Sequence, residues 1–136
     1  MFAKSEKITA VGGEHIPLFA KQTPLPVTEV LVAEHNIEQY MLVVVTPAGK
    51  VKQSAADLFQ PLSGGNRLGV IAYPAKANEP VSTYVHGTFN INAIKYPNGL
   101  FQKTNPTKQE MLTVLKNIAS PVIFFEDCET NPVQRT

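Results

Sequence analysis

The chain has 136 residues with 12 Lys and Arg against 11 Asp and Glu, a formal net charge of +1, and 43% hydrophobic residues. This size fits one domain with a core of its own, and the balanced charge argues against a nucleic-acid-binding protein, whose basic residues are in excess or clustered. The apolar runs are of strand length, far below the ~20 residues of a membrane span, and the first residues lack the apolar core of a secretory signal, so we expect neither.

Residues 1–26 are predicted to form an extended arm. Apolar residues occur there, but Gly12-Gly13 and the prolines at 17, 24 and 26 interrupt every helix or strand period, and a segment punctuated by proline stays extended. Two interpretations stay open from composition. The arm orders on a partner by adding a strand to the partner's sheet, or it folds back on its own domain or frays.

The central part of the chain is predicted to be rich in strands. Residues 27–34 form one strand, and 40–46 form a stronger one that is β-branched and apolar on both faces, which is typical of a central strand. A turn at 47–50 leads to a return strand at 51–53, so we expect a hairpin. Residues 55–59 are expected to form a short helical turn.

Two further stretches, 68–73 and 81–94, are also predicted to be strands, with loops at 61–66 and 74–80. The first is a continuous apolar run. The second alternates with period two over 81–86 and again over 89–94, with Asn90 and Asn92 opposite the apolar positions. Gly87 lies between the two halves, where a bulge or bend is expected.

The only extended helix is expected after Pro106. Thr107 is an N-cap candidate, and Glu110 three residues later completes a capping box. An apolar stripe with helical spacing follows: Met111, Val114, Leu115, Ile118. Pro121 ends the helix, residues 122–125 form a closing strand, and 127–136 form a polar tail. We therefore predict a mainly β (α+β) single domain over residues 27–126.

No residues with a catalytic or metal-binding pattern stand out. The three histidines, His15, His35 and His86, are far apart and none has a partner at metal-ligand spacing. Glu126, Asp127 and Glu129 are interpreted as a solvated tail rather than a cation cage. The single cysteine, Cys128, excludes a disulfide within the chain and a Cys-based zinc site. We expect no catalytic residue, no metal and no cofactor.

The order of motifs from Met41 to Phe125 resembles the head decoration proteins of lambdoid tailed phages. Gly69 to Ala72 resemble the Gly-Ile/Val-Leu-Ala strand of that family, and Gly87 to Phe89 resemble its Gly-x-Phe element. The helix after Thr107 and the closing Ser-Pro-Val-Ile-Phe segment follow in the same order. This chain departs from the family in a longer segment before Tyr40 and a longer tail after Phe125.

The resemblance implies a β-clip fold and a capsid cementing protein without enzymatic activity. Such proteins form trimers at the three-fold sites on the outside of the expanded capsid, bind the major capsid protein through an N-terminal segment, and resist the pressure of packaged DNA. The partners are then the major capsid protein and the chain itself, with no nucleic acid and no membrane. The place of action is the virion surface after assembly in the host cytoplasm.

Two sets of residues follow as hypotheses from this resemblance. The capsid-binding arm carries the apolar anchors Ile8, Val11, Ile16, Leu18 and Phe19. The trimer contact involves Gly64, Gly65, Tyr73 and Pro74, together with the exposed side of the helix.

Two other functions remain as alternatives. One is a tail or baseplate β-module that binds a host receptor. The other is a small nucleotide hydrolase, since the β-clip shape also occurs in that class. A nucleotide hydrolase needs loops that bind phosphate and an Asp on a strand that activates the attacking water. In this chain Asp57 lies in a weakly helical stretch and Asp127 in the tail.

Overall fold

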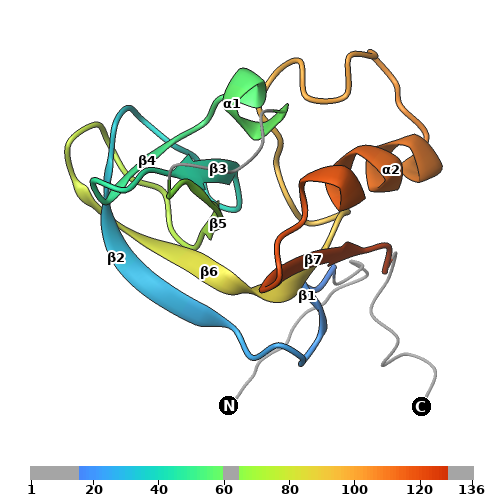
Figure 1. The fold of residues 1–136 in the computed structure, drawn as a ribbon, viewed down its shortest axis with the longest axis horizontal. Helices are drawn as coiled ribbons and strands as arrows, with labels where there is room; N and C mark the ends of the chain where they lie inside the picture. The colour runs from blue at the N-terminus through green and yellow to red at the C-terminus, as the bar shows by residue number, and fades with distance from the viewer. Residues whose placement is uncertain (1–15, 60–64, 129–136) are drawn as a thin grey trace, which may run out of the picture.

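The computed structural model describes residues 16–59 and 65–128 of the chain (Figure 1). Two helices and seven strands lie in these ranges. In chain order they are β1 (Phe19–Lys21), β2 (Val27–Ala33), β3 (Leu42–Val45), β4 (Lys50–Lys52), α1 (Ala55–Phe59), β5 (Arg67–Ile71), β6 (Pro80–Asn90), α2 (Lys108–Ile118) and β7 (Ile123–Glu126). Neither of these helices is long and apolar enough to cross a membrane.

Five of the strands close into a barrel-like sheet. Strand β2 pairs with β6 on one side and with β4 on the other. Strand β4 pairs with β3, β3 pairs with β5, and β5 returns to β6. The interior is filled by a cluster of buried side chains: Leu31, Ala33, Ile37, Met41, Val43, Val45, Val51, Ile71 and Val81. The prediction of a mainly β domain is confirmed.

Strand β3 carries both hydrophobic clusters, which explains why its sequence is apolar throughout. Val43 and Val45 belong to the barrel interior, while Leu42 and Val44 belong to a second cluster on the outside of the barrel. All four side chains are fully buried, because neighbouring residues of a strand point to opposite faces and here both faces are covered. The predicted central strand is therefore confirmed.

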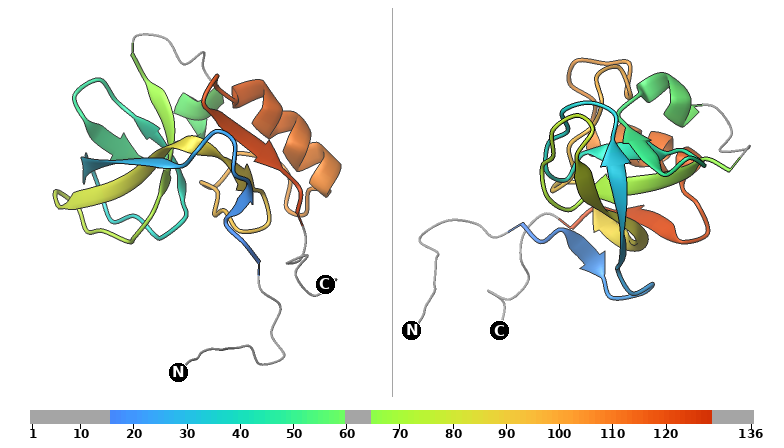
Figure 2. Two further views of the ribbon diagram at one scale, coloured as in Figure 1. Left: turned by 90° about the horizontal axis from the view of Figure 1, so that it is seen from below. Right: turned by 90° about the vertical axis from the view of Figure 1, so that its left-hand side faces the viewer.

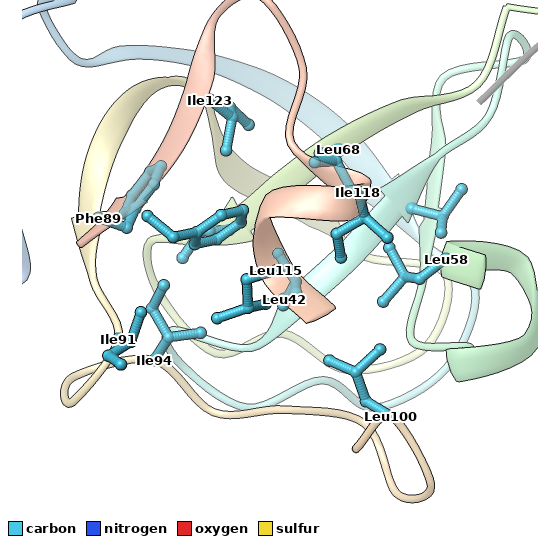
Figure 3. Packing of buried hydrophobic residues seen from close by; sticks show 13 residues of the cluster. Leu42, Leu58, Leu68, Phe89, Ile91, Ile94, Leu100, Leu115, Ile118 and Ile123 are labelled. Carbon is cyan, nitrogen blue, oxygen red and sulfur yellow. The ribbon is translucent and has the colours of Figure 1, made fainter. Parts of the chain in front are cut away.

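The second cluster joins the barrel to helix α2. Figure 3 shows side chains from β3, β5, β6, α1, α2 and β7 converging beside this helix. Leu115 and Ile118, the last two residues of the predicted apolar stripe, are buried in it. The predicted capping box is also present, since Thr107 Oγ1 accepts from the Glu110 N–H at 3.1 Å and Glu110 Oε1 accepts from the Thr107 N–H at 2.9 Å. The N-terminal end of α2 is therefore fixed by its own side chains.

Strand β6 belongs to two parts of the sheet. Its first half closes the barrel, and its last residues pair with β1 on one side and β7 on the other. Gly87 lies between these two parts of the strand and has a φ of +147°. A Cβ at this position would lie 3.1 Å from the ring of Phe19 and 3.3 Å from that of Phe89. The pairing registers of β6 with β1 and with β2 shift on either side of Gly87, inside one continuous strand, and the backbone angle and neighbours of this position favour glycine.

The prediction of a strand over residues 89–94 was wrong beyond Asn90. The chain turns there, with the Ala93 N–H donating to the Asn90 carbonyl at 3.0 Å, and Asn90 itself is fully buried rather than solvated. The reason is that the Asn90 side chain accepts from the Asn92 backbone N–H at 3.1 Å. Such local bonds offer the backbone an alternative to the strand ladder.

Candidate functional site

The described part of the predicted arm lies on the sheet of its own domain. Strand β1 pairs antiparallel with the end of β6, with Phe19 opposite Phe89. Leu18 and Phe19 pack against the second hydrophobic cluster, and the ring of Phe19 meets that of Tyr84 edge to face at 5.0 Å between centroids. Of the two interpretations left open by the sequence, residues 18–21 follow the one in which the segment folds back.

The other arm residues have different positions. Ile16 is 43% exposed and does not belong to either cluster. Ile8 and Val11 lie outside the described residues. The structure thus separates the arm candidates into two packed anchors, Leu18 and Phe19, and one uncovered apolar side chain.

Two buried polar side chains of β6 hold this segment in place. The Asn90 Nδ2 donates to the Pro17 carbonyl at 2.9 Å, and the Thr88 hydroxyl donates to the Thr23 carbonyl at 2.7 Å. Both side chains are almost completely buried, and buried polar groups of this kind are strongly favoured to keep their partners. Residues 17–23 are therefore fixed at both ends of β1.

The chain from Phe19 to Ala33 runs in one direction along β6, because β1 and β2 are both antiparallel to that strand. Figure 2 shows β2 on the near surface of the right-hand view, with β1 close to its start. The outer side of this stretch is apolar and uncovered. We call its exposed large side chains the β2 patch: Leu25 at 71%, Val27 at 40%, Val30 at 73% and Val32 at 39% exposed.

An ion pair lies beside the β2 patch. The Arg67 guanidinium of β5 donates to both carboxylate oxygens of Glu29 in β2, at 3.1 and 3.0 Å. This two-point contact is the geometry that arginine favours with a carboxylate. The hydrogen bonds from Arg67 lower the pKa of Glu29, although burial opposes them. Donating these hydrogen bonds to Glu29 likewise raises the pKa of Arg67. The Glu29 carboxylate, the only charged group of β2, therefore points toward β5.

The structure does not bring the predicted trimer-contact residues together. Gly65 precedes β5, whereas Tyr73 and Pro74 follow it, so the strand separates them by roughly 13 Å at about 3.3 Å per residue. Tyr73 is 68% exposed, and Gly65 and Pro74 are also exposed. Gly64 lies outside the described residues. Gly65 therefore lies at the opposite end of β5 from Tyr73 and Pro74.

Two surface hollows lie beside these elements. A groove of about 730 Å³ lies between β1, β7 and α2, and Phe124 and Leu112 give it an apolar lining beside Lys21, Lys116 and Glu126. A smaller hollow of about 330 Å³ lies beside Arg67 and includes His86. Among the described residues no group of three or more His, Cys, Asp or Glu side chains is placed to hold a metal ion.

The β2 patch was not identified from the sequence. The sequence predicts a strand over residues 27–34, but its valines do not indicate which face is covered. A weak signal was available, since the strand contains one charged residue before Glu34 and six apolar or β-branched ones. Only the pairing of the sheet shows that the face with Val30 and Val32 remains open.

No protein-family model and no curated protein matches this sequence.

Proposed function

We propose that this protein is a capsid decoration protein that binds the outside of an expanded phage head as a trimer at three-fold sites. The observation that carries the proposal is the β2 patch, next to a segment that Asn90 and Thr88 fix on the sheet. Uncovered apolar side chains gathered along one strand and the residues just before it are typical of a protein–protein contact surface. The partner is the major capsid protein of the shell.

Composition and assembly support the same function. Only 17% of the residues are charged, which suits a surface that packs against other proteins, since charged residues are depleted in the centre of an interface. A protein that binds only the expanded shell stabilises that state by mass action. Trimers on three-fold sites add multivalency, so that weak single contacts accumulate.

A β-clip is the finer fold that belongs to this proposal. Its support is the long strand β6, whose pairing registers shift around Gly87 and which pairs in two parts of the sheet. The barrel-like sheet and helix α2 are compatible with this fold type, which also includes a small helical part.

Co-sedimentation with DNA-free shells of the parent phage tests the proposal. The purified protein is mixed with expanded shells and, separately, with unexpanded ones. We expect saturable binding to expanded shells alone, near one copy per major capsid subunit. Absence of binding to both shells refutes the decoration role. Affinity for a glycan or cell surface in the same preparation would instead identify a receptor-binding tail or baseplate module.

The N-terminal segment is tested in the same assay with a cut placed by the structure. Deleting residues 1–15 leaves Leu18 and Phe19 on the sheet, whereas a deletion through residue 20 removes packed side chains of the domain. We expect the first deletion to abolish shell binding and to leave the fold intact. Undiminished binding by this variant would exclude Ile8 and Val11 as capsid anchors.

A further inference from the structure

One edge of strand β2 is open over most of its length. The Val32 N–H donates to Gly49 in the β4 hairpin, whereas the Ala33 N–H donates to Glu79 on the β6 side, each at 3.0 Å. Successive residues of a strand direct their backbone groups to opposite sides. Thr28 and Val30 therefore present their N–H and C=O groups on the side of Val32, away from β6.

Nothing else in the described part of the chain pairs with this edge. Strand β4 joins β2 only at Val32 and Ala33, so the edge is open from Val27 to Leu31. An open edge is a template for another strand, and proteins usually protect it with lysine, proline or a charge that points outward. Strand β2 contains neither lysine nor proline, and its single charge, Glu29, is held by Arg67.

Two of the three exposed side chains beside this edge are apolar, and the third is Thr28. Val30 is 73% exposed and Val32 is 39% exposed, and the two lie on one face because they are two residues apart. An extended segment that paired with Thr28 and Val30 would place alternate side chains on the same face. Backbone hydrogen bonds would give such a contact its affinity, and the valines would favour apolar residues at alternate positions.

We propose that the open edge of β2 receives an extended segment of the major capsid protein, apolar at alternate positions, as an added strand. This inference rests on the proposed decoration function. That function makes the shell the source of this segment, and the uncovered side chain of Leu25, just before β2, extends the apolar surface along which the segment would lie. Pairing of β2 with β2 of a second copy would give a two-fold contact, which does not build a three-fold assembly.

Two variants test the edge, and one matched control goes with them. Thr28→Pro removes an N–H that points to the open edge and leaves the β6 side of β2 unchanged. Val30→Lys places a charge beside the edge. Asn105→Lys adds the same charge in the exposed loop before α2. We expect both β2 variants to lose at least about tenfold in affinity for expanded shells, as the loss of backbone and apolar contacts implies, while Asn105→Lys binds like the wild type.

Hydrogen–deuterium exchange of the wild-type protein gives a second readout that a folding defect in a variant does not affect. The peptide that contains residues 27–31 should gain protection when the protein binds expanded shells, because the Thr28 and Val30 amides become hydrogen-bonded. Circular dichroism and thermal unfolding of each variant establish that its domain is folded before affinities are compared.

The outcomes separate this inference from the function on which it rests. Wild-type binding to shells with no gain of protection at 27–31, and with unchanged affinity of Val30→Lys, overturns the edge site and leaves the decoration role standing. No wild-type binding to shells refutes both. Protection that rises with protein concentration in the absence of shells overturns the inference as well, because the occupant is then a second copy of this chain.

Discussion

Asn90 and Pro17, which lie 73 positions apart in the sequence, are joined by a 2.9 Å hydrogen bond from the Asn90 Nδ2 to the Pro17 carbonyl. The other side-chain atom of the same residue, Oδ1, accepts from the Cys128 N–H at 3.2 Å. A single buried amide therefore connects the segment before β1 to the segment after β7, and both segments to the end of β6.

Replacement of Asn90 by alanine should destabilise the fold. The change removes the partner that the partly buried Pro17 carbonyl and Cys128 N–H have in the Asn90 side chain, and such losses lower the free energy of unfolding by about 2–3 kcal/mol. Urea denaturation followed by circular dichroism measures the effect. Asn98→Ala is the control, because Asn98 is exposed and should change stability by less than about 0.5 kcal/mol. Equal stability of the two variants would contradict the connecting role of Asn90.

Gly69→Ala should destabilise the barrel by overpacking. A Cβ at Gly69 would lie 2.7 Å from the Thr83 methyl carbon and 3.1 Å from a methyl of Val45, inside an interior without room to shift. Such overpacking costs about 1–3 kcal/mol of the free energy of unfolding. Denaturant unfolding of the purified variant provides the measurement.

A second substitution identifies the source of this cost. Thr83→Ser removes the methyl group that an alanine at position 69 would meet and keeps the hydroxyl. In the Thr83→Ser background, the cost of Gly69→Ala should therefore fall by about 1 kcal/mol, a coupling of the size seen for contacting residues. If the two effects add without coupling, the contact between these positions does not limit the packing.

Much of the fold was predictable because local signals agree with the global arrangement. The capping box at Thr107 and Glu110 depends only on residues of one helical turn. The hairpin at 47–50 depends on a short turn between two apolar runs, and both features are confirmed. The apolar run of β3 also predicted a strand with both faces covered. Each of these signals lies within about ten residues.

The features that the sequence did not predict depend on distant residues. In the alternating pattern of its strand, Asn90 occupies a position that would usually face solvent. Its hydrogen-bond partners Pro17 and Cys128 come from near the two ends of the described chain and bury it. The closure of the barrel requires β5 to return to β6, and no local pattern specifies this pairing. For the same reason the open face of β2 could not be located, since exposure depends on where other strands end.

The Glu29–Arg67 pair should make stability depend on pH. The pKa of Glu29 in the folded state is below its ordinary value of 4.5, chiefly because Arg67 donates hydrogen bonds to it. Its contribution is therefore fully present above that ordinary value and is lost as the pH falls through the lower folded pKa. Both side chains are nearly half exposed, so solvent screening limits the pair to about 0.5–1 kcal/mol.

The comparison of Glu29→Gln with the wild type measures this contribution. The difference in unfolding free energy should be constant near neutral pH and should shrink as the pH falls below 4.5. Glu34→Gln is a matched control at an exposed carboxylate, which has only a minor through-space effect on the pKa of Lys52. A difference that persisted unchanged into strong acid would show that Glu29 acts through packing rather than through its charge.

Phe19 should contribute to the stability of the domain, in contrast to the residues that precede it. Its ring lies 5.0 Å from that of Tyr84 and 5.1 Å from that of Phe89, measured between centroids. Phe19→Ala removes a half-buried ring and two aromatic contacts, and should lower the free energy of unfolding by about 2–3 kcal/mol.

Deletion of residues 1–15 leaves β1 in place. It should change the free energy of unfolding by less than about 0.5 kcal/mol, within the range of changes away from packed sites. Denaturant unfolding of both variants beside the full chain checks this. If the deletion costs as much as Phe19→Ala, residues 1–15 stabilise the domain itself, and a loss of shell binding by that variant would no longer identify them as capsid anchors.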